Sequence, residues 1–490
     1  MSEPSITIIG GGFSGVSAAI HLLRHGTFPM RICIVEPREH LAEGLAFSSP
    51  HTDHRLNGPA SGHSLLLDDA QHLTQWCERT NLLSSDPEAA VGGALFIRRR
   101  EFARYVRETL AALVRSCGCG ISVTHLRDEA IELADDGDHY RVSTRNSGTI
   151  ASNMVIVATG NPPRAVPAPL QSLLGTQLLL PDPYELERLQ KVQREACVLV
   201  VGTGLTAMDV VCTLIRQDHL GPITLVSRRG LRPRPHPGPG SPASNIPARI
   251  HGPPPDYTLV GAPGVRRWLA GLRRSINASV SQGKAWQVSF DELRDVVWKL
   301  WPRLPTKEQR RFDRLLRPWY DAHRFRIPGP TDAIVRLAEA RGQLHLEKGR
   351  IGAVRTQDGR VIVKFGDRPE RAFDAIVNAT GFEMSGRPAL LSAAIDAGLL
   401  LPAAAGAGLR VDENCCALNA EGMVQPFLRI VGPPTAGVFG DPVGTIFISA
   451  HIARVLPDVL VHLRSGRSAR FELASHVATG DTRILDARNY

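Results

Sequence analysis

Residues 5–26 read SITIIGGGFSGVSAAIHLLRHG, and this stretch decides the fold of the N-terminal part of the chain. Its apolar run at 6–9 predicts a buried strand, and the apolar residues after Gly15 recur at helical spacing. Between them, Gly10, Gly12 and Gly15 form a Gly-x-Gly-x-x-Gly pattern. In a dinucleotide-binding turn the first glycine permits the tight turn, the second admits a pyrophosphate, and the third lets helix and strand pack closely. A glycine-rich bend without a ligand is the alternative.

An acidic residue stands where such a turn needs one. Glu36 ends the next predicted strand, at 31–36, and a carboxylate there accepts a hydrogen bond from a ribose hydroxyl. The N-terminus of the intervening helix offers unpaired N–H groups and a partial positive charge to phosphates. The predicted site comprises Gly10, Gly12, Ser14, Gly15 and Glu36.

A near-copy of the pattern, VLVVGTGLTAMDVVCTL, occupies residues 198–214 and contributes Gly202, Gly204 and Ala207. The strand that follows it ends in LVSRRG, with Arg228 and Arg229 where an NAD site would place a carboxylate. Guanidinium groups suit a 2′-phosphate, so this second site is predicted to bind NADPH. The alternative is that one or both arginines are ordinary surface residues.

Two predicted strands also end in matching Ala-Thr-Gly segments, here called the Ala-Thr-Gly exits. They are VIVATGN at 155–161 and IVNATGF at 376–382. They add Thr159, Gly160, Thr380 and Gly381 to the predicted cofactor-binding residues. Alternating strands and helices indicate parallel sheets, so the predicted class is α/β with two Rossmann-like dinucleotide-binding domains, for FAD and NADPH. The predicted boundaries are 1–167 and 373–490 for the FAD-binding domain and 168–372 for the NAD(P)H-binding domain. The latter carries a Pro-rich and helical insert at about 231–325, expected to cap the cleft between the two units.

Composition narrows the function classes. The 490 residues are 43% hydrophobic and 21% charged, with a net charge of +9. The arginines are scattered without interleaved aromatic residues, so no nucleic-acid partner is expected, and the positive field suits anionic cofactors or substrates. The eight cysteines show neither a Cys-x-x-Cys pair nor zinc-ligand spacing, so no metal is predicted. No signal peptide and no membrane span are expected, which favours a cytoplasmic location.

Several stretches together resemble the flavoproteins with two dinucleotide-binding domains, in a bacterial FAD/NAD(P)-binding oxidoreductase branch related to the flavin-containing (class B) monooxygenases. The stretches are IIGGGFSG, GLAF (44–47), HRLNGPA (54–60), VIVATGNPP, VGTGLTAMD, RPWYDAHRFRIP (317–328) and LRIVGPPTAG (428–437). The resemblance implies an FAD domain built from both chain ends. It also implies that Asp441 contacts flavin ribityl or phosphate groups, with a turn aspartate as the alternative, and that Asn57 is a catalytic residue near the flavin.

Two departures from related families bear on the reaction. The redox-active cysteine pair of the disulfide reductases is missing, and so is the Phe-x-Gly-x-x-x-His-x-x-x-Trp fingerprint of Baeyer–Villiger enzymes. The leading interpretation is an FAD- and NADPH-dependent monooxygenase that uses molecular oxygen to hydroxylate nitrogen or sulfur in a small molecule. The alternatives are a reductase that passes electrons to a quinone, a carrier or a small molecule, and a non-catalytic nucleotide-binding protein.

Three basic residues of the insert are open to two interpretations. His323, Arg324 and Arg326 either contact an anionic substrate or form a charged packing face between domains. No general base and no oligomeric state are predicted.

Overall fold

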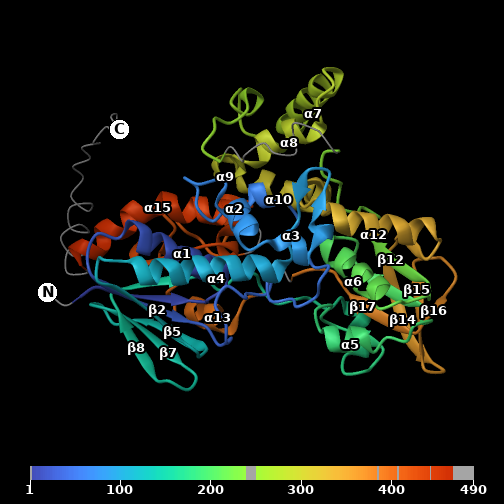
Figure 1. Ribbon diagram of the computed structural model, residues 1–490, viewed down its shortest axis with the longest axis horizontal. Coiled ribbons are helices and arrows are strands. Elements are labelled where there is room, and N and C mark those ends of the chain that lie inside the picture. The colour runs from blue at the N-terminus through green and yellow to red at the C-terminus, as the bar shows by residue number, and fades with distance from the viewer. Residues whose placement is uncertain (1–2, 239–249, 383–385, 405–407, 442, 467–490) are drawn as a thin grey trace.

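The apolar run at 6–9 forms strand β1 (Ser5–Ile9), whose last four residues are buried. A computed structural model describes residues 3–238, 250–382, 386–404, 408–441 and 443–466 (Figure 1). β1 pairs in parallel with β2 on one side and β9 on the other, which places it in the middle of a six-stranded sheet. In spatial order the strands are β18 (Cys416–Leu418), β19 (Val424–Ile430), β9 (Met154–Val157), β1, β2 (Met30–Val35) and β5 (Ile121–Leu126).

Three long helices cover one face of this sheet (Figure 1). They are α1 (Phe13–His25), α4 (Arg99–Ser116) and α15 (Thr445–Ser465). On the other side lie a small antiparallel sheet and helix α13 (Ala389–Asp396). The small sheet comprises β6 (Ala130–Asp135), β7 (Tyr140–Thr144) and β8 (Thr149–Ser152). The first unit is therefore built from both parts of the chain, before residue 167 and after residue 386.

The second unit is a five-stranded, all-parallel sheet. In spatial order its strands are β10 (Leu179–Leu180), β17 (Ala375–Asn378), β11 (Val198–Val201), β12 (Ile223–Ser227) and β13 (Leu344–Lys348). Its helices are α5 (Leu186–Gln190), α6 (Leu205–Arg216) and α12 (Gly329–Ala340), and a three-stranded sheet beside it comprises β14 (Ile351–Gln357), β15 (Arg360–Phe365) and β16 (Arg371–Phe373).

Strand β17 lies in the second unit, whereas the predicted domain boundary places it in the first. The sequence places 375–378 in the C-terminal part of the FAD domain, after residue 373, but β17 pairs with β11 and β10 in the second sheet. It is the counterpart of β9 in the first sheet, because each precedes an Ala-Thr-Gly and each lies next to the strand of a glycine-rich turn. The chain returns to the first unit only after this strand.

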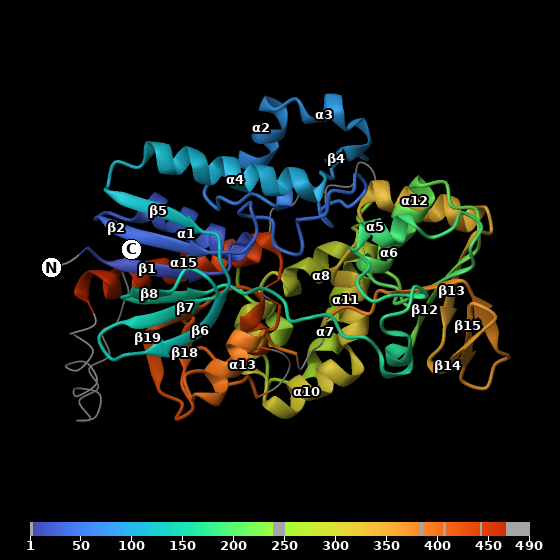
Figure 2. The ribbon, with the colours of Figure 1, turned by 90° about the horizontal axis from the view of Figure 1, so that it is seen from below.

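The insert between β12 and α12 is helical. Its helices stand above the two sheets in Figure 1 and between them in Figure 2. It comprises α7 (Val265–Ser281), α8 (Trp286–Arg294), α9 (Val297–Leu300), α10 (Thr306–Leu315) and α11 (Arg317–Arg324). Trp301 donates from its indole N–H to the Gly437 carbonyl of the first unit at 3.1 Å, and Gln287 donates to the Pro235 carbonyl. The Pro-rich stretch is neither helix nor strand over 231–238 and 250–255, and its residues 239–249 lie outside the described residues.

Short elements complete the first unit. They are α2 (His72–Arg79), α3 (Leu82–Ser85), β3 (Ala90–Val91), β4 (Ala94–Leu95) and α14 (Ala436–Phe439).

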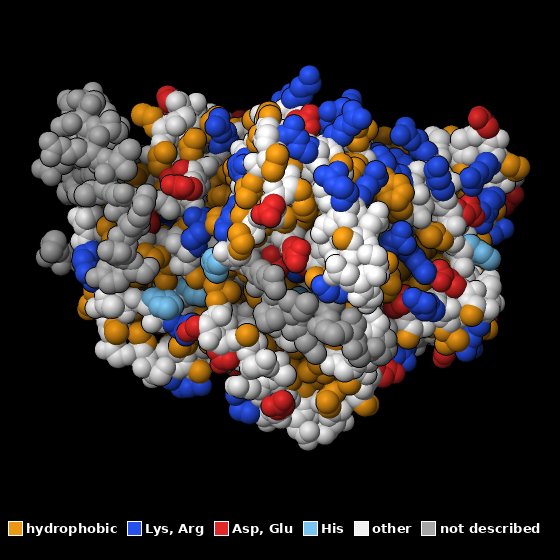
Figure 3. All heavy atoms as spheres, turned by 90° about the horizontal axis from the view of Figure 1, so that it is seen from above, with side chains coloured by type: hydrophobic (Ala, Val, Ile, Leu, Met, Phe, Trp, Pro, Cys, Tyr) orange, Lys and Arg blue, Asp and Glu red, His pale blue; other side chains and the backbone are white. Residues whose placement is uncertain are grey.

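The Lys and Arg side chains are scattered over the face of the molecule that Figure 3 shows. On the face that includes the insert, Lys and Arg side chains alternate with acidic, polar and hydrophobic ones (Figure 3).

Among the described residues, α15 is the one helix long and apolar enough to span a membrane, although the sequence analysis expected no such run. More than half of its apolar stretch is buried in the protein, where α15 packs against α1 and β19. This burial accounts for its apolar composition.

Candidate functional site

The first glycine-rich turn has the backbone geometry that the sequence pattern predicts. Gly10 adopts φ +101°, and a Cβ there would lie 2.6 Å from the Ala158 carbonyl oxygen. A Cβ on Gly15 would lie 1.9 Å from the Gly10 carbonyl oxygen. Gly12 differs, because its nearest heavy atom beyond its chain neighbours would be 3.4 Å away. The fold itself therefore requires the first and third glycines, whereas the space beside the second remains for a ligand.

Glu36 lies beside this turn at the carboxyl end of β2, and it is 4% exposed. Its carboxylate accepts hydrogen bonds from the Gly11 N–H at 2.9 Å and from the Arg38 backbone and guanidinium at 3.1 and 3.0 Å. Ser14 is buried at the start of α1, next to Gly432 of the loop that follows β19. The loops after β1, β2 and β19 thus converge at one edge of the sheet.

The second turn repeats this construction. Gly202 adopts φ +126°, and a Cβ there would lie 2.2 Å from the Ala379 carbonyl oxygen. Gly204 precedes α6, and a Cβ there would meet no heavy atom within 4 Å. Ala207, in the position of the third glycine, is fully buried. A Cβ would thus clash at neither Gly12 nor Gly204, and both turns lead into a helix N-terminus, where unpaired N–H groups favour phosphate.

The two Ala-Thr-Gly exits lie against these turns, and Gly160 and Gly381 adopt positive φ. The Thr159 hydroxyl is buried with no hydrogen-bond partner among the described residues, whereas the Thr380 hydroxyl donates to Asn378 at 2.8 Å. An orphaned hydroxyl beside an open helix N-terminus fits a bound dinucleotide, because a ligand would supply the missing partner.

Arg228 and Arg229 follow directly after β12, at the carboxyl edge of the second sheet. Arg228 is exposed and Arg229 half-buried, and neither forms an ion pair with a described residue. The preceding Ser227 is fixed by hydrogen bonds with the Thr203 hydroxyl and the Gly230 N–H, at 2.9 and 3.0 Å. The two guanidinium groups are thus displayed on a fixed loop without a competing carboxylate.

Asn57 lies in a loop held by buried contacts. Two residues earlier, Arg55 is 1% exposed and forms a bidentate ion pair with Asp86 at 2.8 and 2.9 Å. The Asn57 carbonyl accepts from His236 Nε2 at 2.7 Å, and burial lowers the pKa of His236 to about 4. The Asn57 side chain forms no hydrogen bond with a described residue. Its loop is therefore anchored through the backbone and through Arg55, and its amide is left for other partners.

Asp441 accepts hydrogen bonds from two residues of the insert. Its Oδ2 accepts from Arg324 Nε at 2.6 Å and from the Tyr320 hydroxyl at 3.0 Å. Arg326 pairs with Asp291 at 2.5 and 3.0 Å, and His323 hydrogen-bonds the Trp319 carbonyl of its own helix. Arg324 and Arg326 are both buried, so of the two interpretations the charged packing face describes them. Asp441 accordingly joins the insert to the loop before α15.

Sequence reasoning missed Asp321, which lies next to this cluster on α11. Burial is the main cause that raises the pKa of its carboxyl to about 7, against the opposing effect of Arg317. A carboxyl that titrates near neutral pH can hold or release a proton under working conditions, so Asp321 is a candidate for proton transfer.

Sequence reasoning also missed a polar clamp between the two units. Helix α6 presents Asp209, Thr213 and Arg216 on one face, at a spacing of four and three residues. Asp209 accepts from Arg99 of α4 at 2.8 Å and from the Tyr184 hydroxyl at 2.7 Å.

Two further contacts complete the clamp. Arg216 pairs with Asp53 through two contacts of 3.1 Å, and Thr213 hydrogen-bonds His54 Nε2 at 3.1 Å. Burial lowers the pKa of His54 to about 4, so its ring is neutral in this contact. Helix α6, which begins at the second glycine turn, is thus linked to the first unit by two ion pairs and a hydrogen bond.

Comparison with protein-family models gives two matches. Residues 7–162 match the FAD-NAD(P)-binding family, and residues 91–236 match the L-lysine 6-monooxygenase/L-ornithine 5-monooxygenase family. The first match contains the Gly10–Gly15 turn and Glu36, and the second contains the Gly202–Ala207 turn, Arg228 and Arg229. Comparison with curated proteins finds no significant match.

Solved structures similar to this chain include three hydroxylating enzymes. The ornithine hydroxylase of Pseudomonas aeruginosa has 14% identity and a TM-score of 0.62, with 94% of this chain and 100% of that one covered. The L-lysine 6-monooxygenase of Pseudomonas syringae has 17% identity and a TM-score of 0.61, with 95% and 100% covered. The cadaverine monooxygenase of Erwinia amylovora, solved with FAD, has 14% identity and a TM-score of 0.62, with 94% and 95% covered.

These similarities confirm the predicted α/β class with two Rossmann-like units, and the family match at 7–162 agrees with the predicted cofactors FAD and NAD(P)H. The match at 91–236 agrees with the predicted monooxygenase chemistry at nitrogen. The individual site residues stay predictions whose geometry the structure now supplies.

Proposed function

We propose that this chain is an FAD- and NADPH-dependent monooxygenase that hydroxylates a primary amine of a small molecule. The observation that carries the proposal is the match of 91–236 to the lysine/ornithine monooxygenase family, because this segment contains the second glycine turn and the arginine pair after β12. The similar solved structures are those of an ornithine hydroxylase, an L-lysine 6-monooxygenase and a cadaverine monooxygenase, and ornithine, lysine and cadaverine all carry a terminal primary amine.

The residues of the first cradle fit FAD. The open space at Gly12 and the N-terminus of α1 would receive its pyrophosphate, and the Thr159 hydroxyl would gain a partner. Glu36 would accept from a ribose hydroxyl while it keeps its bond from the Gly11 N–H. Bound there, the flavin would supply the hydride acceptor and the centre that activates molecular oxygen.

The second cradle fits NADPH. The space at Gly204 and the start of α6 would receive the pyrophosphate, and Arg228 and Arg229 would bind the 2′-phosphate through charge-assisted hydrogen bonds. The clamp on α6 would keep this cofactor in one orientation toward the first unit. Thr380 and Gly381 would line the same edge.

The chain's own residues then have distinct tasks. The Asn57 amide, on its anchored loop, would orient groups near the flavin and limit wasteful release of peroxide. The insert would exclude water from the cleft, through contacts such as Trp301 with Gly437 and Arg324 with Asp441.

An oxygen electrode with purified protein and NADPH tests the proposal on L-ornithine, L-lysine and cadaverine, with sulfur nucleophiles as a contrast. We expect one amine to accelerate NADPH and oxygen consumption in equal amounts and to yield a hydroxylamine. Turnover only with an artificial electron acceptor would favour a reductase instead. A cytoplasmic location remains a prediction from the sequence.

A further inference from the structure

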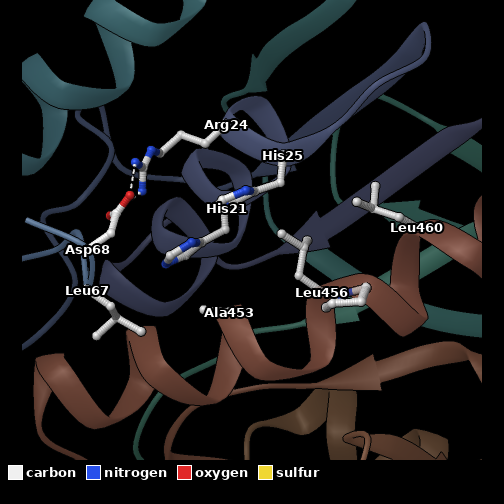
Figure 4. A pocket seen from close by; sticks show the side chains of 9 residues that line it. His21, Arg24, His25, Leu67, Asp68, Ala453, Leu456 and Leu460 are labelled. Carbon is white, nitrogen blue, oxygen red and sulfur yellow. Dashed lines mark hydrogen bonds and ion pairs between the residues drawn. The ribbon is translucent and has the colours of Figure 1, made fainter. Parts of the chain in front are cut away.

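A cavity of about 400 Å³ lies between α1, α15 and the loop at 67–68, and the proposed function does not use it. Its lining from α1 comes from the C-terminal half of that helix, at His21, Arg24 and His25, whereas the glycine turn precedes the other end. Leu67, Leu456 and Leu460 supply apolar walls (Figure 4). Its volume falls in the range of sites for small organic ligands, about 300–1,000 Å³.

His21 is the unusual member of this lining. It is 1% exposed, and neither ring nitrogen has a hydrogen-bond partner among the described residues. Figure 4 shows its ring extending from α1 toward Ala453 on α15. Burial, with the positive charges of His25 and Arg24, lowers the pKa of His21 to about 4. The neutral ring therefore presents one N–H donor and one acceptor without partners, and a buried polar group without a partner is unfavourable.

A second group without its usual partner belongs to a residue that lines the same cavity. Pro457 lies inside α15 and has no N–H, so the carbonyl of Ala453, four residues earlier, lacks its usual helical donor. Both residues line the cavity. The helix thus leaves an acceptor beside the imidazole of His21.

The charges at the rim are already paired. Arg24 donates to both carboxylate oxygens of Asp68, at 3.0 and 2.7 Å (Figure 4). A carboxylate ligand would have to compete with Asp68 for Arg24 and would meet a neutral His21. The chemistry of the cavity accordingly favours an uncharged ligand.

We propose that this cavity is a binding site for an uncharged apolar molecule with one hydroxyl group, such as a small phenol. The hydroxyl accepts a hydrogen bond from the His21 ring N–H and donates one to the Ala453 carbonyl. The apolar body packs against the three leucines. Such a ligand gives a partner to the His21 N–H and to the Ala453 carbonyl at once, which neither an ether nor a hydrocarbon can do.

The test uses three probes on the holoenzyme: 4-ethylphenol, its methyl ether 4-ethylanisole, and 4-ethylbenzoate, each titrated by calorimetry. We expect 4-ethylphenol to bind once per chain and roughly three- to tenfold more tightly than the ether, the range that one net hydrogen bond supplies. His21→Phe should weaken the binding of the phenol and of the ether by a similar factor, because the oxygen of each accepts from the His21 ring N–H. The preference for the phenol should survive, because it comes from the bond that only a hydroxyl donates to the Ala453 carbonyl. His219→Phe is the matched control, because His219 is also buried but lies outside the cavity.

Several results would overturn the proposal: no binding, equal binding of phenol and ether to the wild-type chain, tighter binding of the benzoate, or binding of the phenol to His21→Phe with unchanged affinity. A phenol that perturbs the flavin absorbance would be binding at the cofactor and would also contradict it. If His21→Phe fails to fold, Leu460→Trp narrows the cavity instead. That variant should lose all three probes, and unchanged binding to it would reject the site.

Discussion

At the scale of single residues, the glycines of the first turn have different tasks, and their substitution should separate folding from cofactor binding. A Cβ on Gly15 would overlap the Gly10 carbonyl, whereas a Cβ on Gly12 would make an ordinary contact with Gly44. Gly12→Val should therefore fold, with a native circular dichroism spectrum, but purify colourless because its side chain fills the pyrophosphate space. Gly15→Ala should be insoluble or unfolded. A yellow Gly12→Val protein with one FAD per chain would contradict the site assignment.

The arginine pair after β12 should determine the choice of nicotinamide cofactor. We expect the wild-type flavin to be reduced at a much lower half-saturating concentration of NADPH than of NADH. Arg228→Ala with Arg229→Ala should abolish most of this preference, because each lost charged hydrogen bond is worth roughly 1.5–3 kcal/mol. Rapid-mixing measurements of flavin reduction give both constants. Arg273→Ala, at an exposed position on α7, is the control and should keep the preference, while a double variant that also kept it would place the 2′-phosphate elsewhere.

Asn57 offers a residue-scale test of coupling. Since its side chain has no hydrogen bond to a described residue while Arg55 anchors its loop, Asn57→Ala should retain the fold, FAD and the rate of hydride transfer. It should release more hydrogen peroxide and less hydroxylated product per NADPH consumed. A peroxide assay beside product analysis checks this. Unchanged coupling with a lower melting temperature would instead assign Asn57 a structural role.

At the scale of elements, the clamp on α6 should matter more for the geometry of hydride transfer than for affinity. Asp209→Asn removes the negative charge that Arg99 and Tyr184 share and leaves the largely buried Arg99 guanidinium without its charge partner. Breaking such a pair costs about 3–5 kcal/mol. We expect a lower denaturation midpoint and slower flavin reduction at saturating NADPH, with a smaller change in NADPH affinity.

A surface pair provides the control for this variant. Asp332→Asn removes the partner of Arg336, whose side chain is 59% exposed, so its effect should stay below about 1 kcal/mol. If Asp209→Asn and Asp332→Asn had the same denaturation midpoint and the same rate of flavin reduction, the clamp would not hold α6 in position.

Elements also show where sequence reasoning succeeds and where it fails. Gly10, Gly15 and Glu36 were predictable because the turn, the helix and the acid lie within one short stretch, and their spacing reflects local geometry. The sequence boundary placed strand β17 in the wrong unit because the strand it pairs with, β11, lies far away in the sequence, and no local pattern shows that pairing. Likewise, the ion pairs of Asp441 with Arg324 and of Asp53 with Arg216 each join residues more than a hundred positions apart in the sequence. No local sequence pattern predicts such pairs.

At the scale of the whole molecule, several buried neutral histidines should make stability depend on pH. Burial lowers the pKa of His21 and His54 to about 4 and that of His451 to about 3, while an unfolded histidine titrates near 6.5. Below pH 6.5 the unfolded chain therefore binds more protons than the folded one. Stability is complete above this pH and falls as the pH drops toward 4, by about 1–2 kcal/mol for each histidine between pH 7 and 5.

The raised pKa of Asp321 acts in the opposite direction, because the folded state holds its proton between pH 7 and about 4. One carboxyl does not offset three histidines, so the melting temperature should fall from pH 7 to pH 5. His21→Phe should show a shallower decline than the wild-type chain. A melting temperature that is constant over this range would contradict the assignment of neutral, buried histidines.

The central claim is that one chain uses FAD, NADPH and oxygen to hydroxylate an amine nitrogen. The most direct measurement is turnover with NADPH and the best amine under ¹⁸O₂, followed by mass spectrometry of the product. We predict a hydroxylamine that carries one ¹⁸O atom, formed in proportion to the NADPH consumed. NADPH consumption with an unmodified amine, and with ¹⁸O found only in peroxide or water, would contradict the account.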